Sequence, residues 1–233
     1  MNFNIINFFP TTAYVGQIEN HRQYKEDFYK VYPKFDYDEN ECNNTVSENV
    51  GNPLIHLEDD LNPLFESIVD HIKNYTTNIL NLKDIFNIVI TKTWLSRSRN
   101  SKNSIPWHIH STSHISFVYY ANIPPNSHAI QFSNDNEPNN LFLGMNAEHR
   151  KYERQLIQEF NNINCQTFFI SPNEGDVIIF PSKTKHSTKS ISDDFVGERL
   201  AIVGDVTLTL KEEYLSYSMG YIDPKYWKSF SSR

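Results

Sequence analysis

The chain has 233 residues, of which 39% are hydrophobic and 14% aromatic, enough apolar mass for one large folded domain. Its formal charge is −7 and its basic residues are scattered, which gives no electrostatic footprint for nucleic acid. No apolar stretch approaches the roughly 18 residues of a membrane span. We therefore expect a single cytoplasmic domain over 1–233, with neither nucleic acid nor membrane as a partner.

The first part of the chain, 1–87, has the features of a leading strand followed by supporting helices. Residues 3–16 are β-branched and aromatic with a proline interruption, which is typical of a short strand or edge segment. Apolar residues recur at helical spacing within 21–32 and, more clearly, within 62–80. Two helices are therefore predicted before the main run of strands.

The periodicity then changes to that of β-strands, and 88–210 is predicted to form a β-rich core. The strand-like segments are 86–96, 114–123, 129–134, 165–171, 176–182 and 199–210. Residues 146–160 have a helical pattern between Asn-rich stretches, which indicates an insertion over about 135–164 that could act as a lid. Residues 211–233 form a C-terminal extension. The whole pattern predicts a mainly β fold with flanking helices.

Three histidines form the candidate metal site. His108 and His110 lie two apart before a strong strand, and in an extended chain residues two apart point to the same side. His186 follows a buried-looking strand that would bring it from across the barrel. Imidazole suits iron, zinc, copper or nickel, so spacing alone does not choose the metal. His114 is the alternative to His110 if a turn intervenes at 111–113.

Five motifs carry a resemblance to a known family. They are FFPTTAYVG near the start, TWL at 93–95, WHIHSTSHISFVYYANIP at 107–124, EGDVIIFPSKTKH at 174–186 and ERLAIVGDV at 198–206. Together they resemble the 2-oxoglutarate/Fe(II)-dependent oxygenase superfamily, and most closely a branch of it that is frequent in marine bacteria and phages. The resemblance covers roughly residues 4–16 and 88–208. It implies that 88–210 is a double-stranded β-helix, a jelly-roll or cupin-like barrel.

The resemblance also implies the cofactors and their ligands. In that superfamily a pair H-x-D, H-x-E or, in this branch, H-x-H is followed by a distal histidine. Carried over, the Fe(II) ligands are His108, His110 and His186. Position 110 therefore holds an imidazole where many relatives have a carboxylate.

Arg199 is the residue that the resemblance assigns to the far carboxylate of the co-substrate, 2-oxoglutarate. A guanidinium pairs with a carboxylate through two parallel hydrogen bonds. The alternative for Arg199 is a surface salt bridge with Glu198 or Asp194. Ala201 stands where a hydroxyl residue often supports this arginine.

Tyr119 and Tyr120 alternate faces on a predicted strand, so one of them should point into the barrel. Parity with the histidine pair favours Tyr120, whose phenol could donate a hydrogen bond to a co-substrate carboxylate. Core packing is the alternative for this residue.

The function implied is that of a 2-oxoglutarate- and Fe(II)-dependent dioxygenase, a hydroxylase that couples decarboxylation of 2-oxoglutarate to oxidation of an unidentified substrate. Its partners would be molecular oxygen and a small molecule or a protein side chain. One alternative is a cupin-like metalloprotein with different chemistry. Another is a non-catalytic binding module on the same barrel.

Overall fold

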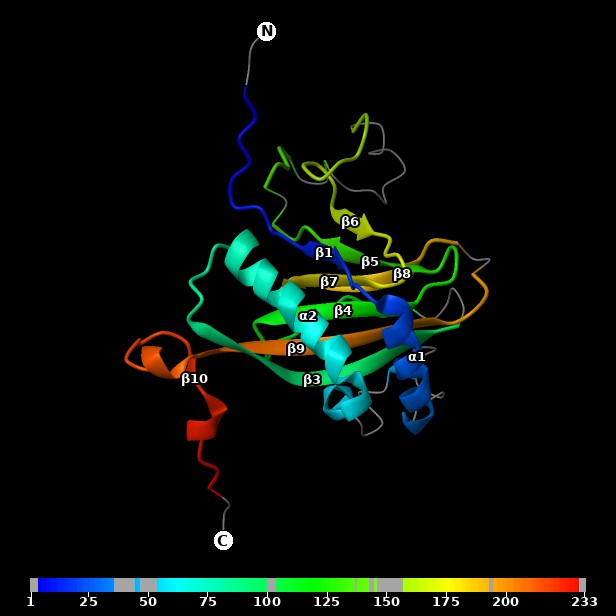
Figure 1. The fold of residues 1–233 in the computed structure, drawn as a ribbon. Helices are drawn as coiled ribbons and strands as arrows, with labels where there is room; N and C mark the ends of the chain where they lie inside the picture. The colour runs from blue at the N-terminus through cyan, green and yellow to red at the C-terminus, as the bar shows by residue number, and fades with distance from the viewer. Residues whose placement is uncertain are drawn as a thin grey trace.

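The structure is a computed structural model of the chain. The residues that it describes are 4–35, 45–46, 54–99, 104–136, 138–142, 145, 157–192 and 195–230. Two helices cover one face of a seven-stranded sheet, and a three-stranded sheet lies across its other face (Figure 1). The described part of the chain is thus mainly β with flanking helices, as predicted.

The larger sheet has the strand order β1-β7-β4-β9-β3-β2, with β10 beside β9. Its strands are β1 (Tyr14–Gln17), β2 (Thr45–Val46), β3 (Phe86–Ser98), β4 (Ile115–Asn122), β7 (Asp176–Pro181), β9 (Arg199–Leu210) and β10 (Tyr221–Ile222). Neighbours along this order are antiparallel, whereas β10 runs parallel to β9. Strands β4 and β9 lie at the centre of this order, and the longest pairing of β9 is with β3.

The smaller sheet has the antiparallel order β6-β5-β8. Its strands are β5 (His128–Ser133), β6 (Thr167–Ile170) and β8 (His186–Ser190). A cluster of buried apolar side chains from both sheets fills the space between them; its members are Trp94, Val118, Tyr120, Ile130, Phe132, Ile178, Phe180, Ala201 and Val203. We call this set the inner cluster. The short loop from β7 to β8 carries the chain from the larger sheet to the smaller one.

The helices pack on the outer face of the larger sheet (Figure 1). They are α1 (His21–Val31) and α2 (Asn62–Asn74), and α2 continues into the π-helical turn η5 (Tyr75–Ile79). Short 3-10 turns are η1 (Tyr32–Lys34), η3 (Ile55–Leu57), η4 (Asp59–Leu61), η7 (Glu212–Tyr214) and η8 (Pro224–Tyr226). The buried residues of α2 recur at three- and four-residue steps, and each fully buried Leu or Ile contributes about 1.5–3 kcal/mol.

Strand β4 shows why its sequence is almost continuously apolar. Phe117 and Tyr119 face the helices, whereas Val118 and Tyr120 belong to the inner cluster. Both faces are therefore buried. Opposite Phe117 on β9 lies Gly204, where a Cβ atom would come within 2.3 Å of the Phe117 ring. Only a residue without a side chain allows this close approach.

Strand β8 was not predicted, because its sequence HSTKS has no apolar residues to mark it. The helix predicted over 146–160 lies outside the described residues except for 157–160, and none of those is helical. The division into a supporting part, a β core and a C-terminal extension stays a prediction. None of the described helices is long and apolar enough to cross a bilayer.

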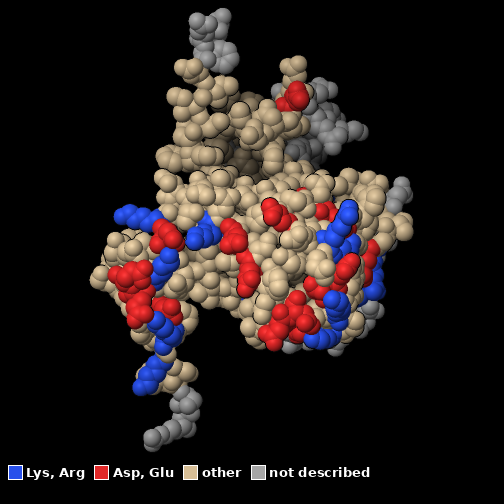
Figure 2. All heavy atoms as spheres, in the orientation of Figure 1, with Lys and Arg blue, Asp and Glu red and all other residues tan. Residues whose placement is uncertain are grey.

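The surface over the helices carries charges of both signs. Figure 2 shows Lys and Arg beside Asp and Glu on this face, whereas the part near β6 is mostly uncharged in this view. Ion pairs here include Lys34–Glu58 at 2.7 Å and Lys25–Glu174 at 2.8 Å. Pairs of this exposed kind contribute about 0–1 kcal/mol each. They therefore contribute little to the stability of the fold.

Candidate metal centre

The backbone around the three histidines is fixed by hydrogen bonds between distant segments. The N–H of His108 donates to the carbonyl of His186 at 2.9 Å, and the reverse bond measures 3.0 Å. The N–H of His110 donates to the carbonyl of Ser182 at 2.9 Å. Ser182 follows β7 in the larger sheet and His186 begins β8 in the smaller one. The histidines therefore meet where the chain passes between the two sheets.

The three imidazole rings converge. Ring centroids are 4.2 Å apart for His108 and His186, 5.1 Å for His110 and His186, and 5.3 Å for His108 and His110. One ring nitrogen of each lies within 4.8 Å of the others, so one metal ion can be held by all three. No other group of three or more His, Cys, Asp or Glu side chains is arranged in this way among the described residues.

Two of the imidazoles have their Nδ1 atoms held by nearby carbonyls. Nδ1 of His108 donates to the Pro106 carbonyl and Nδ1 of His186 donates to the Thr184 carbonyl, both at 2.8 Å. A carbonyl only accepts, so Nδ1 carries the proton and Nε2 keeps a free lone pair. Burial lowers the pKa of His108, and burial together with the neighbouring His108 lowers the pKa of His186 to about 3. Both rings are neutral at pH 7, which is the state that binds metal.

His110 has a different partner. Its Nδ1 lies 2.6 Å from Oδ1 of Asp205 and 2.9 Å from Oγ of Ser116. The same carboxylate oxygen accepts hydrogen bonds from Ser113 at 3.0 Å and from Ser116 at 3.2 Å. Burial alone would raise the pKa of Asp205, but the hydrogen bonds from His110 and the two serines outweigh it and hold this pKa below its usual range. Asp205 is therefore an anion that fixes the Nδ1–H form of His110.

Aromatic side chains pack against the histidine rings. The Trp94 ring lies 5.4 Å from His110, and the rings of Phe180 and Phe132 lie 4.7 and 6.2 Å from His186. These three rings belong to the inner cluster. They restrict ring rotation and keep water away from one side of the site.

Arg199 is buried in the same interior, with 1% of its surface exposed. Its guanidinium carbon lies 5.1 Å from the centroid of the Tyr120 ring, and its Nη1 donates to Oγ of Ser96 at 3.5 Å. Among the described residues, neither Nε of Arg199 nor the Tyr120 hydroxyl makes a hydrogen bond of good geometry. Burial raises the pKa of Tyr120 to about 12, against the charge of Arg199, so the phenol is neutral and able to donate.

The salt-bridge alternative for Arg199 is wrong, because this side chain is not at the surface. Glu198 instead lies 3.0 Å from Nε of Arg99 and 3.7 Å from Arg97. The other partner considered, Asp194, lies outside the described residues.

His114 is not part of the histidine cluster. Its Nδ1 accepts a hydrogen bond from the N–H of Leu208 at 3.0 Å, and its ring stacks on Tyr221 at 5.5 Å. Tyr119 also lies elsewhere, on the helical face, where its hydroxyl is 2.7 Å from Nδ1 of His21. Of the residues singled out from the sequence, the interior therefore holds the three histidines, Arg199 and Tyr120.

The residues that support this site carry little signal in the sequence. Ser96 lies directly opposite Ala201 in the sheet and supplies the hydroxyl contact to Arg199 that Ala201 lacks. Asp205 could have been noticed as a carboxylate inside the apolar run of β9. Ser116 and Ser182, which share a hydrogen bond of 2.9 Å beside Asp205, resemble ordinary strand and turn residues.

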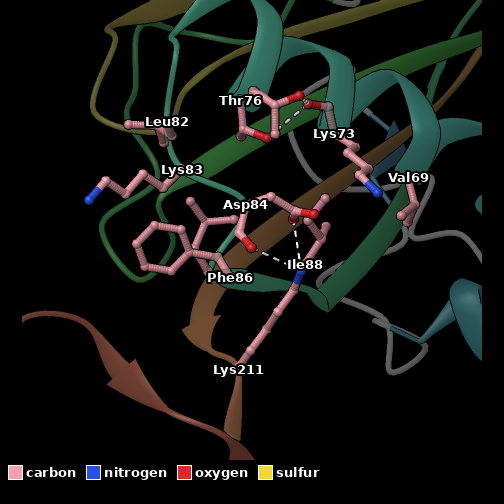
Figure 3. A pocket seen from close by; sticks show the side chains of 11 residues that line it. Val69, Lys73, Thr76, Leu82, Lys83, Asp84, Phe86, Ile88 and Lys211 are labelled. Atoms are coloured by element: carbon pink, nitrogen blue, oxygen red, sulfur yellow. Dashed lines mark hydrogen bonds and ion pairs between the residues drawn. The ribbon is translucent and has the colours of Figure 1, made fainter. Parts of the chain in front are cut away.

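A cavity of about 160 Å³ lies elsewhere, between the end of α2 and the start of β3 (Figure 3). Figure 3 shows Lys73 and Lys83 at its rim and Lys211 paired with Asp84, at 2.8 Å. None of the three histidines lines it. It is a separate feature from the candidate metal centre.

Two facing antiparallel sheets with three converging imidazoles and a buried arginine define a class, the metal-dependent enzymes built on a double-stranded β-helix. Residues 92–205 match the model of the family described as "Putative 2OG-Fe(II) oxygenase". The match includes the three histidines, Arg199 and Asp205. The chain is an oxidoreductase of the dioxygenase type, and the metal and co-substrate of the matched family are Fe(II) and 2-oxoglutarate.

Solved structures share the fold at low sequence identity. The non-haem alpha-ketoglutarate-dependent carbocyclase SnoK of nogalamycin biosynthesis has a TM-score of 0.56 at 8% identity, covering 86% of this chain and 83% of that chain. A Pseudomonas putida prolyl-4-hydroxylase has a TM-score of 0.51 at 9% sequence identity, and the match covers 84% of this chain and 92% of that chain. HygX from Streptomyces hygroscopicus was solved with nickel, 2-oxoglutarate and hygromycin B. It has a TM-score of 0.51 at 13% sequence identity, and the match covers 91% of this chain and 92% of that chain.

These likenesses confirm the predicted double-stranded β-helix. No curated protein matches the chain in sequence.

Proposed function

We propose that this chain hydroxylates a carbon atom of its substrate with molecular oxygen. In the overall reaction, one oxygen atom enters the substrate C–H bond and the other enters 2-oxoglutarate, which leaves as succinate and carbon dioxide. The observation that carries the proposal is the convergence of three imidazoles in an interior that also holds a buried arginine. We expect the substrate to be a small molecule or a protein side chain.

The ligands that we propose for Fe(II) are the Nε2 atoms of His108, His110 and His186. Hydrogen bonds hold the Nδ1 atom of each ring, which leaves Nε2 as the lone pair available to a metal. This donor set fits a divalent ion of the first transition row. When bound, the metal supplies the redox chemistry of oxygen activation.

Arg199 is proposed to bind the far carboxylate of 2-oxoglutarate. A buried guanidinium whose Nε has no hydrogen-bond partner among the described residues is suited to an anion that enters the barrel. The contact with Ser96 restrains Nη1, and the neutral phenol of Tyr120 is placed to donate a further hydrogen bond. These residues would orient the co-substrate.

The inner cluster would exclude water from the reacting atoms. Trp94, Phe132 and Phe180 border the histidine rings, and a dry apolar wall strengthens the electrostatic contacts inside it. Exclusion of water also limits unproductive side reactions of the activated oxygen.

An anaerobic titration tests the proposal. Fe(II) added with 2-oxoglutarate to the metal-free protein should give a weak visible charge-transfer band, and oxygen should then release succinate. Both signals should be absent in His186→Ala. His114→Ala is the matched control, because this histidine lies in the same part of the chain but outside the cluster, and it should keep both signals. A normal band in His186→Ala would contradict the proposed ligand set.

A further inference from the structure

Each histidine of the cluster has an anchor on its Nδ1 atom, and one anchor differs from the other two. His108 and His186 donate to backbone carbonyls two residues before them in the chain. His110 donates to the side chain of Asp205, 95 positions away on β9, at 2.6 Å. A carbonyl can only orient an imidazole, whereas a carboxylate also adds a full negative charge behind it.

We infer that Asp205 is a positioning residue that supplies, through His110, the negative charge that three neutral imidazoles do not provide to a bound divalent cation. The inference rests on the metal-binding part of the proposed function and is independent of the co-substrate and of catalysis. The carboxylate of Asp205 is hydrogen-bonded to Nδ1 of His110, the ring atom that is not proposed to bind the metal.

The surroundings of Asp205 are built to keep this charge in place. The residue is 5% exposed, and besides His110 the side chains that donate to it are the neutral hydroxyls of Ser113 and Ser116. Ser182 joins both serines, at 2.7 and 2.9 Å, and closes the network. The shortest contact of the Asp205 carboxylate is the one to Nδ1 of His110, at 2.6 Å, so the charge of Asp205 is directed at this imidazole.

A carboxylate at this position carries a cost that a purely structural role would not require. Burying an ionised group is unfavourable unless it is paired and hydrogen-bonded, and a neutral side chain could orient His110 equally well. An imidazole that donates Nδ1–H to a carboxylate is a stronger base at Nε2. The ring therefore transmits the charge of Asp205 to whatever cation Nε2 binds.

The arrangement also fixes the tautomer and the tilt of His110. Trp94 packs against one side of the ring, 5.4 Å between centroids, while Asp205 and Ser116 hold its Nδ1 atom. This ring can direct only its Nε2 toward His108 and His186. Asp205 acts here without touching the metal or the substrate.

The test compares metal affinity with stability in the absence of metal. Asp205→Asn keeps the size of the side chain and an oxygen that can accept from Nδ1, but it removes the charge. Zn(II) and Fe(II) dissociation constants, measured anaerobically by competition with a chromophoric chelator, should rise about 10–100-fold in this variant. Ser116→Ala is the matched control, since it perturbs the same network without removing the charge, and its constants should stay close to wild type.

Two outcomes would overturn the inference alone: Asp205→Asn binding metal as tightly as wild type, or Ser116→Ala losing as much affinity as Asp205→Asn. Absence of metal binding by the wild type would overturn the proposed function and this inference with it. The thermal midpoint of each metal-free variant shows whether the fold is intact.

A second measurement does not depend on the stability of a variant. In the Zn(II)-loaded wild type, NMR of the imidazole N–H groups should show the Nδ1 proton of His110 downfield of those of His108 and His186, since a carboxylate is the stronger acceptor. A His110 ring that lacks an Nδ1 proton, or one with the same shift as the other two, would contradict the role of Asp205.

Discussion

Substitution of Arg199 by methionine should stabilise the empty protein while abolishing its response to 2-oxoglutarate. The side chain is 1% exposed, and its hydrogen bond to Oγ of Ser96 is long, at 3.5 Å. Its Nε has no partner among the described residues, and a buried polar group of this kind costs about 1–3 kcal/mol. Methionine fills a similar volume without that cost.

The free energy of unfolding of metal-free Arg199→Met should therefore rise by about 1–3 kcal/mol. For a chain of this length each kcal/mol shifts the thermal midpoint by about 2–4 °C, a change that urea and thermal unfolding both resolve. Arg22→Met is the control, because Arg22 is exposed on α1 and its loss should change stability by less than about 0.5 kcal/mol.

The affinity for 2-oxoglutarate should move in the opposite direction. Truncating one partner of a buried, hydrogen-bonded charge pair costs about 2–5 kcal/mol, which corresponds to at least a tenfold rise in the dissociation constant. Calorimetric titration of the Zn(II)-loaded protein with 2-oxoglutarate measures this dissociation constant without turnover. The assignment of Arg199 would be refuted if the Arg199→Met variant were less stable than wild type and still bound 2-oxoglutarate with normal affinity.

Three further predictions rest on other contacts in the structure. His186→Ala should lose most of its Zn(II) affinity in the chelator competition, whereas His114→Ala should keep it. Gly204→Ala should lower the free energy of unfolding by about 1–3 kcal/mol in urea, because its Cβ would lie 2.3 Å from the Phe117 ring; an unchanged midpoint would contradict this packing. Burial lowers the pKa of His56, so the unfolded chain binds its proton more readily and stability should fall as the pH drops below about 6.5; His56→Gln should flatten that slope.

The sequence predicted the elements whose apolar residues follow a clear period. Helix α2 and strands β3, β4, β7 and β9 lie close to their expected positions, because burial on one or both faces fixes which residues are apolar. Strand β8 carries Ser, Thr and Lys, so no period marks it, and only its pairing with β5 makes it a strand.

The candidate site was predictable where side chains share a short stretch of chain. His108 and His110 are two residues apart, and a local rule places them on one side. Asp205 and Ser96 reach the site from other strands, and their roles depend on the register between β3, β4 and β9. Register is set by tertiary packing, which a single sequence does not reveal.

Strand β9 carries two buried charged residues on one face, the cation of Arg199 near its start and the anion of Asp205 further along. Side chains alternate along a strand, so the two share a face because an even number of positions separates them. Inserting or deleting one residue between them would rotate one charge toward the helices while leaving the other in place. Surface loops generally accept insertions, but this strand has to preserve that parity, which makes β9 intolerant of single-residue changes in length.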